Sequence, residues 1–202
     1  MKKTSPKIVV LVSGSGSNLQ AIIDSIGAGE LKAEIAAVVS NKKAAFGLER
    51  AKNADIPAVY FPYKPFKEQG REAYDQALAK KVASFEPDLI VLAGWMRIFT
   101  PAFLNQFPNQ VINLHPALPG TYIGANGVDW AWDSFKAGKI SKTGCMVHVA
   151  TIDLDEGPVI ATADIELFAE DTKEDFVKRL RAAEHKLIVQ GVSKALETNL
   201  QK

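Results

Sequence analysis

The chain is poor in the residues that form disulfides and metal sites. Its 202 residues include one cysteine, Cys145, and three histidines. A single cysteine excludes an internal disulfide and is compatible with a reducing compartment. Its apolar surroundings, Gly-Cys-Met-Val-His-Val, indicate an inert buried thiol rather than a nucleophile. The histidines lie too far apart in the sequence to show a metal-ligand spacing, so we expect no metal.

The chain also lacks an excess of charge of one sign and any long hydrophobic run. Its 24 Lys and Arg residues against 23 Asp and Glu residues give a net charge of +1, which offers no reason to expect binding to nucleic acid or to a membrane surface. No apolar run approaches the roughly 18 residues of a membrane span. The first residues lead into a strand-like run rather than into the apolar core of a signal peptide. We therefore expect a cytoplasmic protein that acts on small molecules.

Short apolar runs alternate with helical patterns along most of the chain. A chain of 202 residues can bury one full core, so we expect one domain over residues 1–202. The early runs are apolar on both faces and are separated by helices, which predicts a Rossmann-like α/β fold: a mainly parallel sheet with helices on both faces. The last two runs have no helix between them and predict an antiparallel C-terminal extension, with a turn at 153–157. The predicted strands are 8–12, 33–39, 58–61, 89–93, 110–114, 145–150 and 159–167; the predicted helices are 18–26, 46–53, 71–85 and 171–196, the last capped by Asp171 or Thr172.

A glycine-rich turn, Ser13-Gly14-Ser15-Gly16-Ser17-Asn18, joins the first predicted strand to the first helix. Glycines let the backbone approach an anion, and a helix start directs free N–H groups and a partial positive charge toward it. A dinucleotide fingerprint would need glycine at Leu19 and an acid after the second strand, where Ser40-Asn41-Lys42 stands, so a Rossmann cofactor is disfavoured. We expect a phosphate site here; the alternative is a tight turn capped by Asn or Ser.

Asn113 and His115 alternate across Leu114, so in an extended segment both side chains point to one side. They stand where the fifth predicted strand ends, and the carboxyl ends of strands are where ligands of open α/β sheets bind. Downstream, Asp155 supplies a carboxylate in Leu-Asp-Glu-Gly-Pro. An amide can hold an oxyanion, an imidazole can move a proton, and a carboxylate can keep that imidazole charged. Together they predict the addition of a nucleophile to a carbonyl carbon.

Each of these residues also has a purely structural alternative. His115 fits a partly buried imidazole bonded to backbone, and Asp155 lies in a stretch rich in turn formers. His148 stands in the middle of a strand-like run, where a hydrogen-bonded core histidine is expected rather than a catalyst.

Glu184 interrupts the apolar stripe of the final helix. A carboxylate inside such a stripe is costly unless it has a partner, such as a buried donor or a ligand hydroxyl. Pairing with a lysine or arginine is the structural alternative. The other members of the stripe are Phe176, Leu180, Ala183, Leu187 and Gly191.

Several motifs, in order, resemble the phosphoribosylglycinamide formyltransferases, folate-dependent enzymes of purine synthesis. The resemblance runs from about Lys7 to about Val192 and includes Ala-Glu-His at 183–185. The other motifs are Ile-Val-Val-Leu-Val-Ser-Gly-Ser-Gly-Ser-Asn-Leu-Gln-Ala-Ile at 8–22, Ala-Phe-Gly-Leu-Glu-Arg-Ala at 45–51, Arg-Glu-Ala-Tyr-Asp at 71–75, Leu-Ala-Gly-Trp-Met-Arg-Ile at 92–98, Asn-Leu-His-Pro-Ala-Leu at 113–118 and Leu-Asp-Glu-Gly-Pro-Val-Ile at 154–160.

The resemblance implies a formyltransferase fold in which 10-formyltetrahydrofolate, as co-substrate and without a metal, gives its formyl group to the amine of phosphoribosylglycinamide. It implies a phosphate-binding half at about 1–100 and a catalytic and folate half at about 101–202. The matching positions imply a role for each site residue. The catalytic residues would be Asn113, His115 and Asp155. The phosphoribosyl substrate would be bound by Gly16, Ser17, Asn18 and Glu184, with Glu184 contacting the ribose hydroxyls, and the folate site would be lined by Arg71, Met96, Arg97, Ile98, Phe99 and Asn113.

For the chemistry we expect Asn113 and protonated His115 to hold the oxyanion. We expect Asp155 to raise the pKa of His115 above its usual value of roughly 6.5. Solvated side chains are the structural alternative for Arg71 and Arg97.

The chain departs from the family pattern at residues 117–127, where the loop after His115-Pro116 is shortened and altered, and at Gly94-Trp95, where Gly-Phe is usual. This loop is expected to flex over the phosphate.

Two rival functions are a folate-dependent formyltransferase acting on a sugar nucleotide or a tRNA, and a non-enzymatic nucleotide-binding domain. The extra domains of the tRNA enzyme and of formyltetrahydrofolate hydrolase do not fit in this length. A monomer and a homodimer are both compatible with the sequence.

Overall fold

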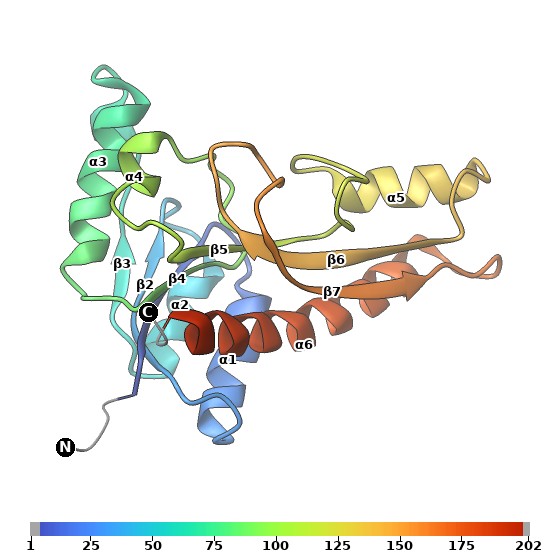
Figure 1. The fold of residues 1–202 in the computed structure, drawn as a ribbon, viewed down its shortest axis with the longest axis horizontal. Coiled ribbons are helices and arrows are strands. Elements are labelled where there is room, and N and C mark those ends of the chain that lie inside the picture. Colours follow the sequence, from blue (N-terminus) through green and yellow to red (C-terminus); the bar gives the residue numbers. More distant parts are fainter. Residues whose placement is uncertain (1–4, 200–202) are drawn as a thin grey trace.

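The structure, a computed structural model, describes residues 5–199 as a seven-stranded sheet flanked by helices (Figure 1). The strands are β1 (Lys7–Val12), β2 (Glu34–Ser40), β3 (Ala58–Tyr60), β4 (Leu89–Leu92), β5 (Val111–His115), β6 (Lys142–Val149) and β7 (Val159–Glu166). The helices are α1 (Ser17–Gly27), α2 (Phe46–Asn53), the 3-10 turn η1 (Lys64–Phe66), α3 (Gly70–Ala83), α4 (Pro101–Leu104), α5 (Gly127–Lys136) and α6 (Lys173–Asn199).

The strands lie in the order β3-β2-β1-β4-β5-β6-β7. β1 to β5 are parallel, and β6 and β7 add antiparallel pairs, which confirms the predicted fold class. In Figure 1 the β6–β7 hairpin extends away from the parallel strands. The chain direction across the sheet reverses between β1 and β4, and the carboxyl ends of strands at such a reversal are where ligands of doubly wound sheets bind.

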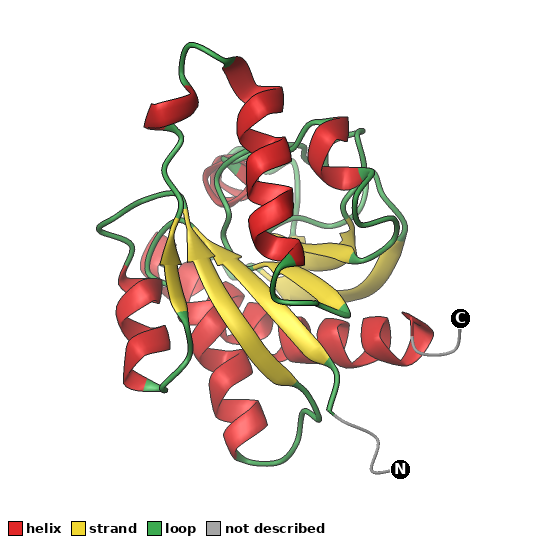
Figure 2. Cartoon of the chain, turned by 90° about the vertical axis from the view of Figure 1, so that its left-hand side faces the viewer, coloured by secondary structure: helices red, strands yellow, loops and turns green. Residues whose placement is uncertain are grey.

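Helices cover both faces of the twisted sheet (Figure 2). Alternate residues of β1 divide between two cores: Val10 packs with residues of α1, α2 and α6, whereas Val9 packs with residues of α3 and α4. Strand residues point to opposite faces with a period of two, so a strand that is apolar at every position needs both layers. The continuous apolar runs of the sequence therefore account for the three-layer arrangement.

One substantial helix, α5, was not predicted. Trp130 and Trp132 stand two positions apart, a spacing that does not mark one helical face. The helix is instead held by tertiary aromatic contacts: the Trp132 ring stacks on Phe176 of α6, with centroids 6.1 Å apart, and the Trp130 ring lies 5.4 Å from Tyr122. The short helices α4 and η1 were also not predicted, and β6 begins at Lys142 rather than at Cys145.

The long helix α6 begins with a reciprocal cap. The hydroxyl of Thr172 accepts a hydrogen bond from the Asp175 N–H at 3.2 Å, and the Asp175 carboxylate accepts one from the Thr172 N–H at 3.2 Å. This is a capping box, and of the two predicted caps it is Thr172 that fills this role.

None of the helices within residues 5–199 has the length and apolarity needed to cross a lipid bilayer.

Candidate active site

A pocket of about 320 Å³ opens where β4 and β5 end. Two segments far apart in the sequence form its walls: residues 94–99, after β4, and residues 148–155, from the end of β6 into the turn before β7. Asn113 and His115 reach it from the end of β5. The pocket therefore lies at the edge of the sheet where the topology places ligands.

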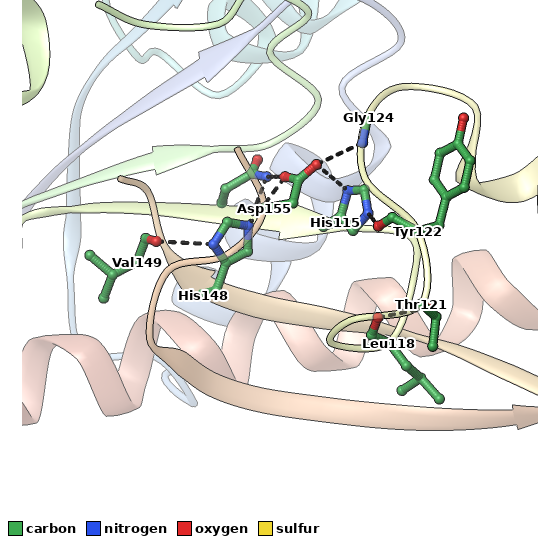
Figure 3. Close-up of polar contacts among 9 residues, drawn as sticks. His115, Leu118, Thr121, Tyr122, Gly124, His148, Val149 and Asp155 are labelled. Carbon is green, nitrogen blue, oxygen red and sulfur yellow. Dashed lines mark hydrogen bonds and ion pairs between the residues drawn. The ribbon is translucent and has the colours of Figure 1, made fainter. Parts of the chain in front are cut away.

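The three predicted catalytic side chains meet at this pocket (Figure 3). Nδ1 of His115 lies 3.4 Å from Oδ2 of Asp155, and Nδ2 of Asn113 donates to Oδ1 of Asp155 at 3.3 Å. Asn113 and His115 thus point to the same side of β5, as their alternation across Leu114 predicts. Asp155 reaches them from the turn between β6 and β7 and has a φ of 57°, so it also has the turn role that its sequence context indicated.

His115 is buried, and both of its ring nitrogens face acceptors. Its Nε2 lies 2.9 Å from the carbonyl oxygen of Tyr122, and because a carbonyl can only accept, this contact is a hydrogen bond when Nε2 is protonated. Burial lowers the pKa of His115, and this outweighs the raising effects of the Asp155 charge and of the Tyr122 carbonyl. Our expectation of a pKa above the usual value is therefore wrong for this structure, because desolvation of the imidazolium exceeds its attraction to one carboxylate.

Asp155 is held in its ionised form by several donors. Burial alone would raise its pKa, but the neighbouring His148, the hydrogen bond from the Gly124 N–H and the nearby His115 lower it below the usual range. The Gly124 N–H donates to Oδ2 at 2.9 Å. Segment 117–126 therefore contacts both catalytic partners, through Gly124 at Asp155 and through Tyr122 at His115.

His148 belongs to the same cluster, although its position in an apolar strand indicated a core histidine. It is 1% exposed and lines the pocket. Its Nδ1 donates to the Val149 carbonyl at 3.0 Å, while its Nε2 lies 3.2 Å from Nδ2 of Asn113 and 3.5 Å from Oδ1 of Asp155. The antiparallel register pairs His148 directly with Asn113, and this pairing cannot be deduced from the sequence pattern alone.

Residues 96–99, predicted to line the folate site, all border the pocket, but their side chains differ in environment. Met96 and Ile98 are 62% and 52% exposed and form an apolar rim. Phe99 is buried in a stack with Trp95 and Phe103, so it supports the wall from within the core.

Two arginines near this wall make specific contacts: Arg97 is partly buried, whereas Arg71 is exposed, as its structural alternative expected. The guanidinium of Arg97 lies over the rings of Tyr63 and Tyr74, 4.0 and 5.0 Å from their centroids. Arg71 does not border the pocket; its Nη2 donates to the carbonyl of Ile98 at 2.5 Å. Both side chains therefore help to fix the position of the pocket segment 94–99.

The glycine-rich turn lies beside this wall at the end of β1. The hydroxyl of Ser13 accepts a hydrogen bond from the Met96 N–H at 2.9 Å and donates one to Asn41 at 2.7 Å. Gly16 adopts a left-handed conformation, with φ 69°, and α1 begins at the next residue. The first N–H groups of a helix have no acceptor within it. Together with the neighbouring turn they form what we call the anion cradle, an arrangement compatible with the predicted phosphate site.

Glu184 contacts this same helix start. Its Oε2 accepts a hydrogen bond from Nδ2 of Asn18 at 3.4 Å, and burial raises the pKa of its carboxyl, an effect that the Asn18 bond only partly opposes. Within residues 5–199 no ion pair of Glu184 with lysine or arginine is found, so its structural alternative is not supported. Oδ1 of Asn18 is buried without a hydrogen-bond partner among the described residues. An unsatisfied buried acceptor beside a partly buried carboxylate is suited to a ligand that carries hydroxyl or amine donors.

Neither a reactive cysteine nor a metal site is found among the described residues. Cys145 is buried, and desolvation raises the pKa of its thiol to about 12, which agrees with an inert core residue. In the described part of the chain, no group of three or more His, Cys, Asp or Glu side chains is arranged to hold a metal ion.

Comparisons with known proteins agree with this geometry. The chain is 42% identical over 202 residues to the phosphoribosylglycinamide formyltransferase of Schizosaccharomyces pombe, covering 95% of this chain and 98% of the relative, and 43% identical over 196 residues to that of Dictyostelium discoideum, covering 92% and 95%. The crystal structure of glycinamide ribonucleotide transformylase 1 from Symbiobacterium toebii superposes with a TM-score of 0.90 at 34% identity, covering 98% of this chain and 90% of that one. Residues 6–192 match the formyl transferase family model, and the chain belongs to the formyl transferase family.

Proposed function

We propose that this protein transfers the formyl group of 10-formyltetrahydrofolate to the amine of phosphoribosylglycinamide, giving the N-formyl product and tetrahydrofolate in purine biosynthesis. The observation that carries the proposal is the convergence of Asn113, His115 and Asp155 at one end of a mainly apolar pocket, with the anion cradle of α1 beside it. An amide, an imidazole and an ionised carboxylate suit acyl transfer to an amine.

The folate co-substrate is assigned to the pocket. An apolar wall with exposed Met96 and Ile98 fits a flat heteroaromatic group, and backbone groups of residues 94–98 and of the 151–155 turn can bond its polar edge. In this proposal Arg97 and Phe99 act by supporting the wall. Arg71, which holds the Ile98 carbonyl, stands at the rim, where it can also meet an anionic tail.

The phosphoribosyl substrate is assigned to the glycine-rich turn. Free N–H groups around Gly16, Ser17 and Asn18 would bind the phosphate, and Glu184 would accept hydrogen bonds from the ribose hydroxyls. This places the glycinamide amine between the turn and His115. In this proposal the phosphoribosyl substrate and the folate bind to neighbouring parts of the site, next to the catalytic cluster.

The chemistry is a direct transfer. The amine nitrogen attacks the formyl carbon and forms a C–N bond, while the carbonyl electrons move to oxygen. Collapse of this tetrahedral adduct breaks the bond to N10 of the folate, and the proton lost by the amine ends on N10. We assign the oxyanion to Nε2–H of His115 and Nδ2–H of Asn113, and the proton transfer to His115 or to a water molecule held by it.

Both proposed oxyanion donors, His115 and Asn113, must exchange their present contacts for the oxyanion to be held. Nε2 of His115 faces the Tyr122 carbonyl, and Nδ2 of Asn113 lies 3.2 Å from Nε2 of His148 and 3.3 Å from Oδ1 of Asp155. The two Asn113 contacts are long, so they cost little to replace. Replacing the Tyr122 carbonyl by the reacting oxygen requires a shift of segment 117–126, which fits the expectation that this loop moves during the reaction.

Three wider expectations remain predictions: a cytoplasmic location, a monomer or homodimer, and a division into a phosphate-binding half (1–100) and a folate half (101–202) within one domain over 1–202. The rival functions, formylation of a sugar nucleotide and non-catalytic nucleotide binding, are less well supported, because the buried catalytic cluster and the anion cradle are adjacent.

The deciding experiment follows tetrahydrofolate release from 10-formyltetrahydrofolate with and without phosphoribosylglycinamide. We expect release to depend on that amine. A sugar nucleotide that replaces it with equal kcat/KM would favour the first rival. Calorimetric binding of NAD or ATP, with no turnover in any mixture, would favour the second.

A further inference from the structure

Helix α2 packs directly against the glycine-rich turn, and it donates two hydrogen bonds to backbone carbonyl groups of that turn. The N–H of Gly47 donates to the carbonyl of Gly14 at 3.1 Å, and Nε of Arg50 donates to the carbonyl of Ser15 at 2.8 Å. Two successive peptide groups of the turn are thereby fixed from the same side.

Because the peptide bond is planar, these two hydrogen bonds also set the direction of the N–H groups of Ser15 and Gly16. The described residues contain no cis peptide bond, and in a trans peptide the C=O and N–H vectors are antiparallel. Since the Gly14 and Ser15 carbonyls point to α2, the N–H groups of Ser15 and Gly16 point away from it. These N–H groups then add to those at the start of α1 as donors to one anion.

The close packing needs glycine on both sides. A Cβ on Gly16 would lie 2.7 Å from Cα of Gly47, and a Cβ on Gly47 would lie 2.8 Å from a methyl group of Val12. The backbone of α2 therefore lies directly against the backbone of the turn. This short separation allows the side chain of Arg50, which belongs to α2, to reach the Ser15 carbonyl.

Arg50 is itself held in place. Its Nη1 donates to Oε1 of Gln20 on α1 at 2.9 Å, and its guanidinium lies over the ring of Phe46, 4.9 Å from the centroid. Gln20 is fixed in turn by Asp24, to which it donates at 2.8 Å. Two donor atoms of the guanidinium are thus used within the protein, which suits a residue that shapes the turn rather than one that binds the ligand directly.

We propose that Arg50 is a positioning residue for the phosphate site: by fixing the Ser15 carbonyl it directs the Gly16 and Ser15 N–H groups at the phosphate monoester. This inference rests on the proposed function for the identity of the phosphate ester. It concerns the orientation of the backbone and not the charge of the arginine, and this difference can be tested.

The test compares Arg50→Met, Arg50→Lys and the control Lys52→Met. Lys52 lies on the same helix, is exposed and pairs with Glu49 at 2.8 Å, so its loss removes the same charge from α2 without touching the turn. Steady-state kinetics are measured with phosphoribosylglycinamide and with its dephosphorylated form, glycinamide riboside. For Arg50→Met we expect KM for the phosphorylated substrate to rise about 10-fold or more, with kcat and the folate KM within about 2-fold of wild type, because a charge-assisted hydrogen bond to the turn is lost.

The riboside separates positioning from general damage. We expect kcat/KM for glycinamide riboside to be the same in wild type and Arg50→Met, and Lys52→Met to match wild type with both substrates. Arg50→Lys should behave like Arg50→Met, since an ammonium point charge does not reproduce the planar guanidinium fork. A lysine variant that matches wild type would show that charge suffices and would overturn the proposal, as would an equal loss with both substrates.

A second measurement does not depend on turnover. Inorganic phosphate is titrated into ¹⁵N-labelled wild type and Arg50→Lys, with the Gly16 and Ser15 amide shifts as readout. We expect saturable shifts in wild type that weaken about 10-fold in the variant; equal titrations would overturn the inference. If wild type shows the phosphate shifts but does not formylate phosphoribosylglycinamide, the proposed function fails while the role of Arg50 stands.

Discussion

Nδ2 of Asn18 lies 3.4 Å from Oε2 of Glu184, and this contact joins the start of α1 to the middle of α6. It places a partly buried carboxylate next to the glycine-rich turn, although the two residues come from opposite ends of the chain. A negative charge in that position is costly in the folded protein, because burial raises the pKa of Glu184. A site that retains such a group gains from it in ligand binding rather than in stability.

The first prediction concerns Glu184→Gln. We expect binding of phosphoribosylglycinamide to weaken by about 1–3 kcal/mol, the range for losing a hydrogen bond to a charged group. The folded pKa lies above the unfolded value, so wild type loses stability as the pH rises from the unfolded pKa through the folded one. The variant should lack this loss and have an equal or higher melting temperature at neutral pH. Normal substrate binding with a lower melting temperature would instead make Glu184 a structural residue.

The second prediction concerns Asp155→Asn, which keeps the size of the side chain and removes its charge. Burial already lowers the pKa of His115, and the Asp155 charge is the largest effect that raises it, so the pKa should fall further in the variant. We expect kcat to drop by about 10²-fold or more, since the imidazolium that holds the oxyanion becomes scarcer. The alkaline limb of the kcat profile should move to lower pH.

The His115 titration itself decides this prediction. It can be followed by NMR of the imidazole in wild type and in Asp155→Asn. If the two titrations coincide, Asp155 shapes the turn at 151–155 but does not act through the charge of His115.

The third prediction concerns Ser17→Asp, at the first residue of α1. A carboxylate placed in the anion cradle should repel the phosphate and raise KM for phosphoribosylglycinamide many-fold, whereas the folate KM should change by less than about 2-fold. Ser17→Ala distinguishes the added charge from the lost hydroxyl and should show a much smaller effect. Equal changes in both KM values would place the turn in the folate site instead.

The fourth prediction concerns His148→Phe. Removing Nε2 leaves the Asn113 amide with one contact, to Asp155, so its orientation toward the reacting carbonyl should loosen. We expect kcat to fall about 10-fold with both KM values nearly unchanged, because the effect reaches the transition state through Asn113. Full activity in a folded variant would show that His148 is only a hydrogen-bonded core histidine, as its sequence context indicated.

The pattern of apolar residues was sufficient to predict the sheet and most of its helices, because period and length are local properties of the chain. Helix α5 was not predictable in this way, since its aromatic side chains are satisfied by Tyr122 and by Phe176, which are distant in sequence. For the site, the residue types of Asn113, His115 and Asp155 indicated acyl-transfer chemistry, and the alternation along β5 placed two of them on one side.

By itself, then, the sequence determined the fold class, the glycine-rich turn that precedes α1 and the residue types on which the proposed chemistry depends. Only the tertiary structure decided their electrostatics: the depth of burial that lowers the His115 pKa, the strand register that sets His148 against Asn113, and the loop backbone that occupies Nε2 of His115. Desolvation and hydrogen bonding depend on which distant segments surround a group, and a pattern of neighbouring residues carries no information about them.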